Sequence, residues 1–142
     1  MMVSVTDREL PVLAEGFGVG GEHWTLTTQL DRNRVRTMVQ VVEPDGRRWG
    51  AGFGGRPVPP ERRVATFVGR SGESAHLVIV RVAPEVRAVR ATLSDGTVDD
   101  LTLHGDVERL GARIAVLVYP APLDLHRLTL LDKDGQELPD VL

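Results

Sequence analysis

Among the residue types that could form a functional site in this chain, arginine has the most suggestive distribution. Residues 32–70 hold nine arginines against three acidic side chains, a net charge of +6, whereas the whole chain carries −3. Guanidinium groups bind carboxylates and phosphates through paired hydrogen bonds. The sequence therefore predicts a binding site for a protein or an acidic ligand around residues 54–63. Its candidate residues are Arg47, Arg48, Arg56, Arg62 and Arg63. The alternative interpretation is a solvated face that pairs with the acidic second half of the chain.

Metal binding is a second possibility, and its weak candidates are His104 and Asp106. On one face of a strand these two side chains would lie about 6.6 Å apart along the backbone, near enough to share an ion. Two ligands do not make a site, and no third is apparent. Cysteine is absent, which removes thiol nucleophiles, disulfides and cysteine-ligated zinc. We expect neither a resident metal nor a cofactor.

Three other motifs resemble known functional sites, but the residues that flank them do not fit those sites. Two glycine runs, Gly16-Gly18-Gly21 and Gly50-Gly52-Gly55, match the spacing of a dinucleotide loop, but neither is followed by a helix pattern. The segment 132–135 resembles the start of a calcium loop, but the chain ends before the remaining ligands. Serines at 71 and 74 lie near His76 without the strand–turn–helix setting of a hydrolase nucleophile.

The elements that would position these residues are short strands. Asp-Gly pairs at 45–46, 95–96 and 134–135 predict hairpin turns, and the flanking residues alternate between apolar and polar. Residues 77–82 are apolar on both faces, which indicates a strand at the centre of a sheet, and residues 114–119 are predicted to form a second strongly apolar strand. The proline-rich segment 54–63 is predicted to cross between sheets. Residues 106–111 are expected to form one helical turn.

No stretch of eleven or more residues has a helical period, and the strand spacing is typical of a sandwich or a barrel. The long crossover favours an all-β, antiparallel β-sandwich of about nine or ten strands. We expect residues 1–21 to be loosely structured and residues 22–142 to form this domain.

A family resemblance supports the sandwich. Residues 82–86, Val-Ala-Pro-Glu-Val, followed by residues 89–96, Val-Arg-Ala-Thr-Leu-Ser-Asp-Gly, resemble uncharacterised immunoglobulin-like domains of GC-rich bacteria. The resemblance extends over roughly residues 75–140. It implies an immunoglobulin-like fold and no activity.

Composition narrows the range of functions. An acidic net charge and 4% aromatic residues argue against nucleic-acid binding. No apolar run is long enough to cross a membrane. The first nine residues lack the pattern of a secretory signal, so we expect a cytoplasmic protein, without excluding export after signal removal.

The favoured function is a non-catalytic binding or accessory module of a bacterial cell, with a protein as the expected partner. The alternatives are a small metal-dependent enzyme or hydrolase, and a self-assembling domain that forms a homo-oligomer through its edge strands.

Overall fold

A computed structural model describes residues 12–71 and 75–142 of the chain. In these residues it contains eleven strands and one four-residue helix. All pairings between the strands are antiparallel. The elements are β1 (Val12–Phe17), β2 (His23–Asp31), β3 (Arg34–Val42), β4 (Arg48–Phe53), β5 (Val64–Ser71), β6 (Ala75–Val82), β7 (Ala88–Leu93), β8 (Val98–Leu101), α2 (Val107–Leu110), β9 (Arg113–Pro120), β10 (Leu125–Leu131) and β11 (Glu137–Leu138).

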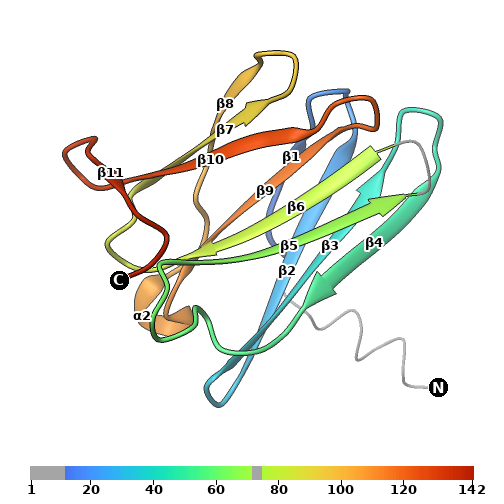
Figure 1. The fold of residues 1–142 in the computed structure, drawn as a ribbon. Coiled ribbons are helices and arrows are strands. Elements are labelled where there is room, and N and C mark those ends of the chain that lie inside the picture. The colour runs from blue at the N-terminus through green and yellow to red at the C-terminus, as the bar shows by residue number, and fades with distance from the viewer. Residues whose placement is uncertain (1–11, 72–74) are drawn as a thin grey trace, which may run out of the picture.

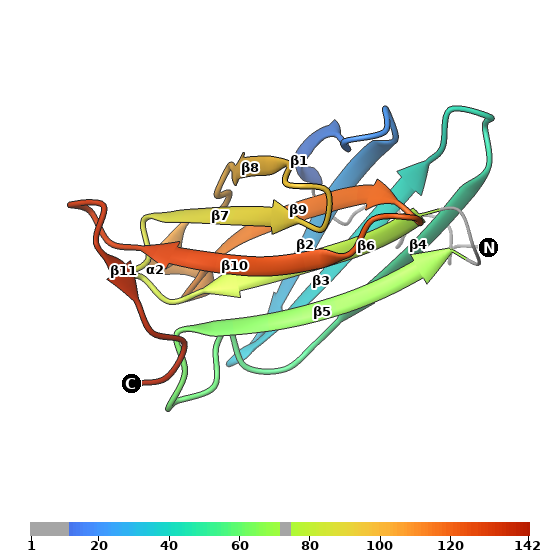
Figure 2. The same ribbon diagram turned by 45° about the horizontal axis from the view of Figure 1, so that its top comes forward.

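The strands form three stacked sheets. The N-terminal sheet has the order β1-β2-β3-β4, the middle sheet β5-β6-β9 and the C-terminal sheet β11-β10-β7-β8. One buried cluster joins the middle sheet to the N-terminal sheet, and another joins it to the C-terminal sheet. The middle sheet is therefore covered on both faces, as Figures 1 and 2 show from two directions. The predicted all-β antiparallel sandwich is confirmed; its immunoglobulin-like character stays a prediction.

Burial on both faces explains the apolar sequences of β6 and β9. All eight residues of β6 are buried, and so are six of the eight in β9. Because side chains alternate along a strand, Leu77 and Ile79 pack toward the N-terminal sheet, while Val78 and Val80 pack toward the C-terminal sheet. β6 lies at the centre of its sheet, as its apolar sequence predicts.

All three predicted Asp-Gly turns are confirmed, and they connect β3 to β4, β7 to β8 and β10 to β11. Gly46, Gly96 and Gly135 have φ values of 90°, 90° and 80°, a left-handed conformation that glycine adopts without steric cost. In the first two turns the aspartate Oδ1 accepts a hydrogen bond from the N–H two residues later. In the third, Asp132 fulfils this role by accepting from the N–H groups of residues 134 and 136.

The two predicted connections also form. Residues 54–63 lead from β4 in the N-terminal sheet to β5 in the middle sheet. α2 is the expected single helical turn, with the Asp106 carboxylate accepting the N–H of Glu108 at its start and Gly111 ending it at a φ of 76°. Neither glycine run is followed by a helix in the described residues, since Gly16 lies in β1 and Gly50 and Gly52 lie in β4.

β1 differs from the loose structure expected for residues 1–21. It pairs with β2 from Val12 to Phe17, with an irregularity between Val12 and Ala14. Gly16 lies directly on the Trp24 indole, because a Cβ at this position would come within 2.6 Å of the ring. This contact between paired strands leaves no periodic signal in the sequence. Residues 1–11 of the expected segment lie outside the described residues.

Candidate functional site

The structure places the five predicted arginines at three separate locations. Arg47 and Arg48 follow the β3–β4 turn, and Arg47 contacts the Asp45 carboxylate at 3.2 Å. Arg56 lies beyond the other end of β4, a strand whose six residues span about 17 Å. Arg62 and Arg63 stand just before β5, where Arg62 forms a β-bridge with Val141. These residues therefore do not form one continuous patch.

Arg63 is engaged within the fold. Its Nη1 donates hydrogen bonds to the carbonyl oxygens of Pro139 and Val141, at 3.0 and 3.2 Å. Its Nε lies 3.3 Å from the Glu85 carboxylate. Arg63 thus attaches the end of the chain to the crossover segment. This role is structural and leaves little of the guanidinium available to a ligand.

A hollow of about 770 Å³ lies beside β3 and β4, at the end of the molecule where Arg56 is found. We call it the arginine hollow, because Arg34 and Arg36 contribute to its wall. Both point away from the core, since Val35 and Thr37, which alternate with them along β3, are buried. The remaining lining residues are Gln29, Asp31, Val35, Met38, Gly52, Phe53, Gly54 and Gly55.

Glycines in and after β4 keep the hollow open. At Gly52 a Cβ would lie 2.4 Å from the Met38 sulfur and 2.2 Å from the Thr37 carbonyl oxygen, so a larger residue cannot fit without displacement. Gly54 and Gly55 continue this bare strip into the crossover loop, and the Gly55 carbonyl accepts the Val35 N–H at 2.7 Å. The strip without side chains lies beside the strand that carries Arg34 and Arg36, because β4 pairs with β3.

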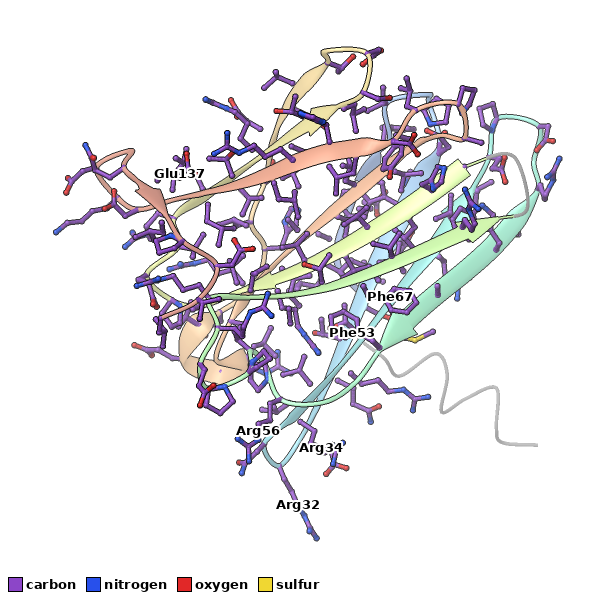
Figure 3. The ribbon with its side chains drawn as sticks, viewed as in Figure 1. Arg32, Arg34, Phe53, Arg56, Phe67 and Glu137 are labelled. Atoms are coloured by element: carbon purple, nitrogen blue, oxygen red, sulfur yellow. The ribbon has the colours of Figure 1, made fainter. Side chains whose placement is uncertain are left out.

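Four arginines give this end of the molecule its charge. Arg34 and Arg36 line the hollow, and the side chains of Arg32 and Arg56 extend near Arg34 (Figure 3). None of the four guanidinium groups has a hydrogen bond or ion pair with another residue in the ranges 12–71 and 75–142. The lining residues include one carboxylate, that of Asp31, which offsets one of these four positive charges. The local charge is therefore +3.

A fifth arginine, Arg81, lies beneath the lining. It projects from β6 toward the N-terminal sheet and is 1% exposed. Nη1 donates to the Val35 carbonyl oxygen at 2.7 Å and to Thr37 Oγ1 at 3.2 Å, while Nη2 donates to the Gly54 carbonyl oxygen at 3.0 Å. The guanidinium also stacks 3.8 Å above the Phe53 ring. Burial lowers the pKa of Arg81 to about 10. This side chain fixes β3 against the start of the crossover loop.

The arginine hollow was only partly predictable. The alternation Arg34-Val35-Arg36-Thr37 places both arginines on the outer face of one strand. Their meeting with Arg56 depends on the path of the loop after β4, which no local pattern records. Arg81 reads in the sequence as one charge within an apolar strand, and its partners are 27 to 46 residues away.

His104 and Asp106 do not converge on a metal. The Asp106 carboxylate caps α2, whereas the His104 ring packs edge-on against Trp24 with 5.9 Å between centroids. Burial lowers the pKa of His104. Among the described residues no group of three histidine, aspartate or glutamate side chains could hold an ion.

His76 likewise has a structural environment. Its ring stacks on Tyr119 at 4.9 Å, and its Nε2 lies 3.2 Å from the Ala121 carbonyl oxygen. Ser74, one of the two serines near it in the sequence, lies outside the described residues.

Comparison with family models, curated proteins and solved structures finds no match. Nowhere in the described part of the chain is there a helix long and apolar enough to span a membrane. The case for function therefore depends on the geometry of the sites.

Proposed function

We propose that this chain is a non-catalytic binding module that captures an acidic segment of another protein in the arginine hollow. The observation that carries the proposal is the set of four guanidinium groups in or near the hollow, none with a hydrogen bond or ion pair to another described residue, with one carboxylate in the lining. Arginine forks bind carboxylates with two parallel hydrogen bonds, which gives both attraction and orientation. The resemblance to bacterial immunoglobulin-like domains is consistent with a module of this kind.

The shape of the hollow favours an extended acidic segment over a compact catalytic substrate. β3 holds the cations, and the glycine strip on the neighbouring β4 lets a peptide backbone approach closely. The arginines of the wall are spaced two residues apart along β3, the spacing at which alternate side chains of an extended peptide lie. A glutamate-rich peptide can therefore place successive carboxylates against Arg34 and Arg36.

Titration with a hexaglutamate peptide, followed by amide chemical shifts at low salt, tests the proposal. We expect shifts in β3 and residues 52–56, and binding that weakens as salt screens the charges. The double variant Arg34→Glu and Arg36→Glu should weaken binding by about tenfold or more, because two attractive contacts become repulsive.

The matched control reverses two exposed arginines elsewhere, Arg87 and Arg109, which leaves the net charge equal to that of the test variant. We expect the control to bind within about twofold of the unmodified chain, apart from the general effect of net charge. Equal losses in the two variants would refute the site. A single-stranded oligonucleotide that binds more tightly than hexaglutamate at the same residues would refute the choice of a protein partner.

A further inference from the structure

The middle sheet has one strand fewer than the sheets that cover it. Each outer sheet has four strands and the middle sheet has three. On one side of the molecule, β4 and β5 are the edge strands of their sheets. The ring of Phe53 in β4 stacks on the ring of Phe67 in β5, with 5.7 Å between their centroids (Figure 3). At the opposite side β9 is the edge of the middle sheet, and β1 and β8 are the edges of the outer sheets there. The missing position lies beside β9.

Only part of the β9 edge is occupied by the described chain. Ile114 exchanges two backbone hydrogen bonds with His104, both 2.8 Å, and the Val118 carbonyl accepts the Val19 N–H at 2.9 Å. In an antiparallel strand every second residue directs its N–H and C=O to the same edge. Val116 stands between these two contacts, so both of its backbone groups point to the free edge. Within the described residues neither group has a hydrogen-bond partner.

These groups open into a second hollow, of about 220 Å³, which we call the edge groove. Trp24 and Val116 contribute from the core. β1 supplies one wall, and β8 with the residues after it supplies the other; Figure 2 shows the two strands near one another. The lining residues are Glu15, Gly16, Phe17, Trp24, Asp99, Asp100, Leu101, Thr102, His104 and Val116.

The charge of the groove indicates the kind of occupant. Three carboxylates line it, those of Glu15, Asp99 and Asp100. Arg90 pairs with Asp100 at 2.8 Å and His23 lies 3.1 Å from Glu15. Asp99 has no ion-pair partner among the described residues. It shares the inward face of β8 with the buried Leu101, so its carboxylate faces the empty position of the middle sheet.

We propose that the edge groove binds a short extended segment of a partner protein that carries basic residues on both sides of an apolar one. The apolar residue pairs with Val116 and exchanges two backbone hydrogen bonds with it. Directly paired residues in antiparallel strands share a face, so this side chain points with Val116 toward Trp24. The flanking basic side chains point to the other face, toward Asp99. This site is separate from the arginine hollow and takes a ligand of opposite charge.

The test uses the tripeptide acetyl-Arg-Val-Arg-amide, titrated into the full chain and followed by amide chemical shifts. We expect a downfield shift of the Val116 N–H, because it gains a hydrogen bond. Methylating the central amide nitrogen of the peptide removes one of the two pairing hydrogen bonds without altering charge, and should weaken binding about fivefold or more. Acetyl-Glu-Val-Glu-amide should not bind.

Asp99→Asn should weaken the tripeptide about fivefold or more, whereas Asp134→Asn in the distant β10–β11 turn should leave its affinity unchanged. Equal affinity of the methylated and unmethylated peptides would rule out strand pairing. Concentration-dependent dimerisation that perturbs Val116 would instead identify a second copy of the chain as the occupant and overturn the proposal. Loss of hexaglutamate binding at the arginine hollow has no bearing on these outcomes.

Discussion

At the scale of single residues, Arg81 shows how a buried charge is retained without a carboxylate partner. Removing a guanidinium from water is costly, and the lowered pKa of Arg81 reflects that cost. Three acceptor oxygens and the face of Phe53 offset it. The three acceptors belong to β3 and the crossover loop, so the side chain joins segments that no backbone ladder connects to β6.

Arg81→Ala should lower the free energy of unfolding by about 3 kcal/mol or more, because it leaves buried acceptors unpaired and opens a cavity. Arg81→Lys should recover only part of the loss, since an ammonium cannot stack on Phe53 and span three acceptors at once. Urea denaturation measures both. The exposed Arg87→Ala serves as control, with an expected change within about 0.5 kcal/mol. An unfolding midpoint for Arg81→Ala equal to that of the unmodified chain would contradict this account.

Tyr119 provides a pH-dependent signal, because it is the one tyrosine in the sequence. Burial raises its pKa above the ordinary value of 10, and the nearby Asp124 carboxylate acts in the same direction. Folding therefore favours the protonated phenol. From about pH 10 upward the unfolded state binds fewer protons than the folded state, so stability falls as pH rises toward the folded pKa.

The ultraviolet absorbance of tyrosinate measures the pKa of Tyr119 directly. The titration midpoint should lie above 10 in the native chain and return to about 10 in concentrated urea. Tyr119→Phe should remove this contribution to the alkaline loss of stability. A native midpoint at or below the midpoint in urea would show that the hydroxyl is not protected by burial.

At the scale of elements, the Asp-Gly turns define three hairpins by backbone conformation. Gly96 has a φ of 90°, and no atom lies within 4 Å of where its Cβ would be. Gly96→Ala should therefore cost about 1 kcal/mol, all of it from the strained backbone. Gly54 offers a matched control, because its Cβ position is equally open and its φ lies outside the left-handed range. Gly54→Ala should be near neutral in the same thermal denaturation experiment, and equal losses at the two positions would contradict the conformational argument.

These elements also show what the sequence could and could not predict. The turns, the crossover and the buried strands β6 and β9 follow from local chemistry, and all of them form. β1 was not predicted, because Leu13, Ala14 and Gly16 give no alternation and the strand exists through its pairing with β2. The arginine hollow, like β1, could be predicted only in part, because it also depends on contacts between separate segments. Period-two spacing identifies Arg34 and Arg36, but only the folded loop brings Arg56 to them, and it carries Arg62 and Arg63 elsewhere.

At the scale of the molecule, the middle sheet is assembled from distant parts of the chain. β6 pairs with β9, so that Leu77 lies opposite Val118, and the β7–β8 hairpin is inserted between the two strands in sequence. The middle and C-terminal sheets are therefore interwoven. By contrast, the N-terminal sheet is one continuous stretch, residues 12–53. Its attachment to the middle sheet uses the buried cluster around Leu26, Leu77 and Ile79.

Because of this arrangement, the backbone can be cut in the crossover loop to give two fragments that each keep whole sheets. Cutting between Pro59 and Pro60, both exposed, separates the continuous sheet from the interwoven pair without dividing a strand. The two fragments should reassociate when mixed and restore the native fluorescence of Trp24 and Trp49, whereas a cut between Ile79 and Val80 should abolish recovery. Failure of the first pair to recombine would show that the covalent crossover is required. Successful recombination, by contrast, would make this chain a split reporter divided at its proline-rich loop, whose halves signal the meeting of two proteins to which they are fused.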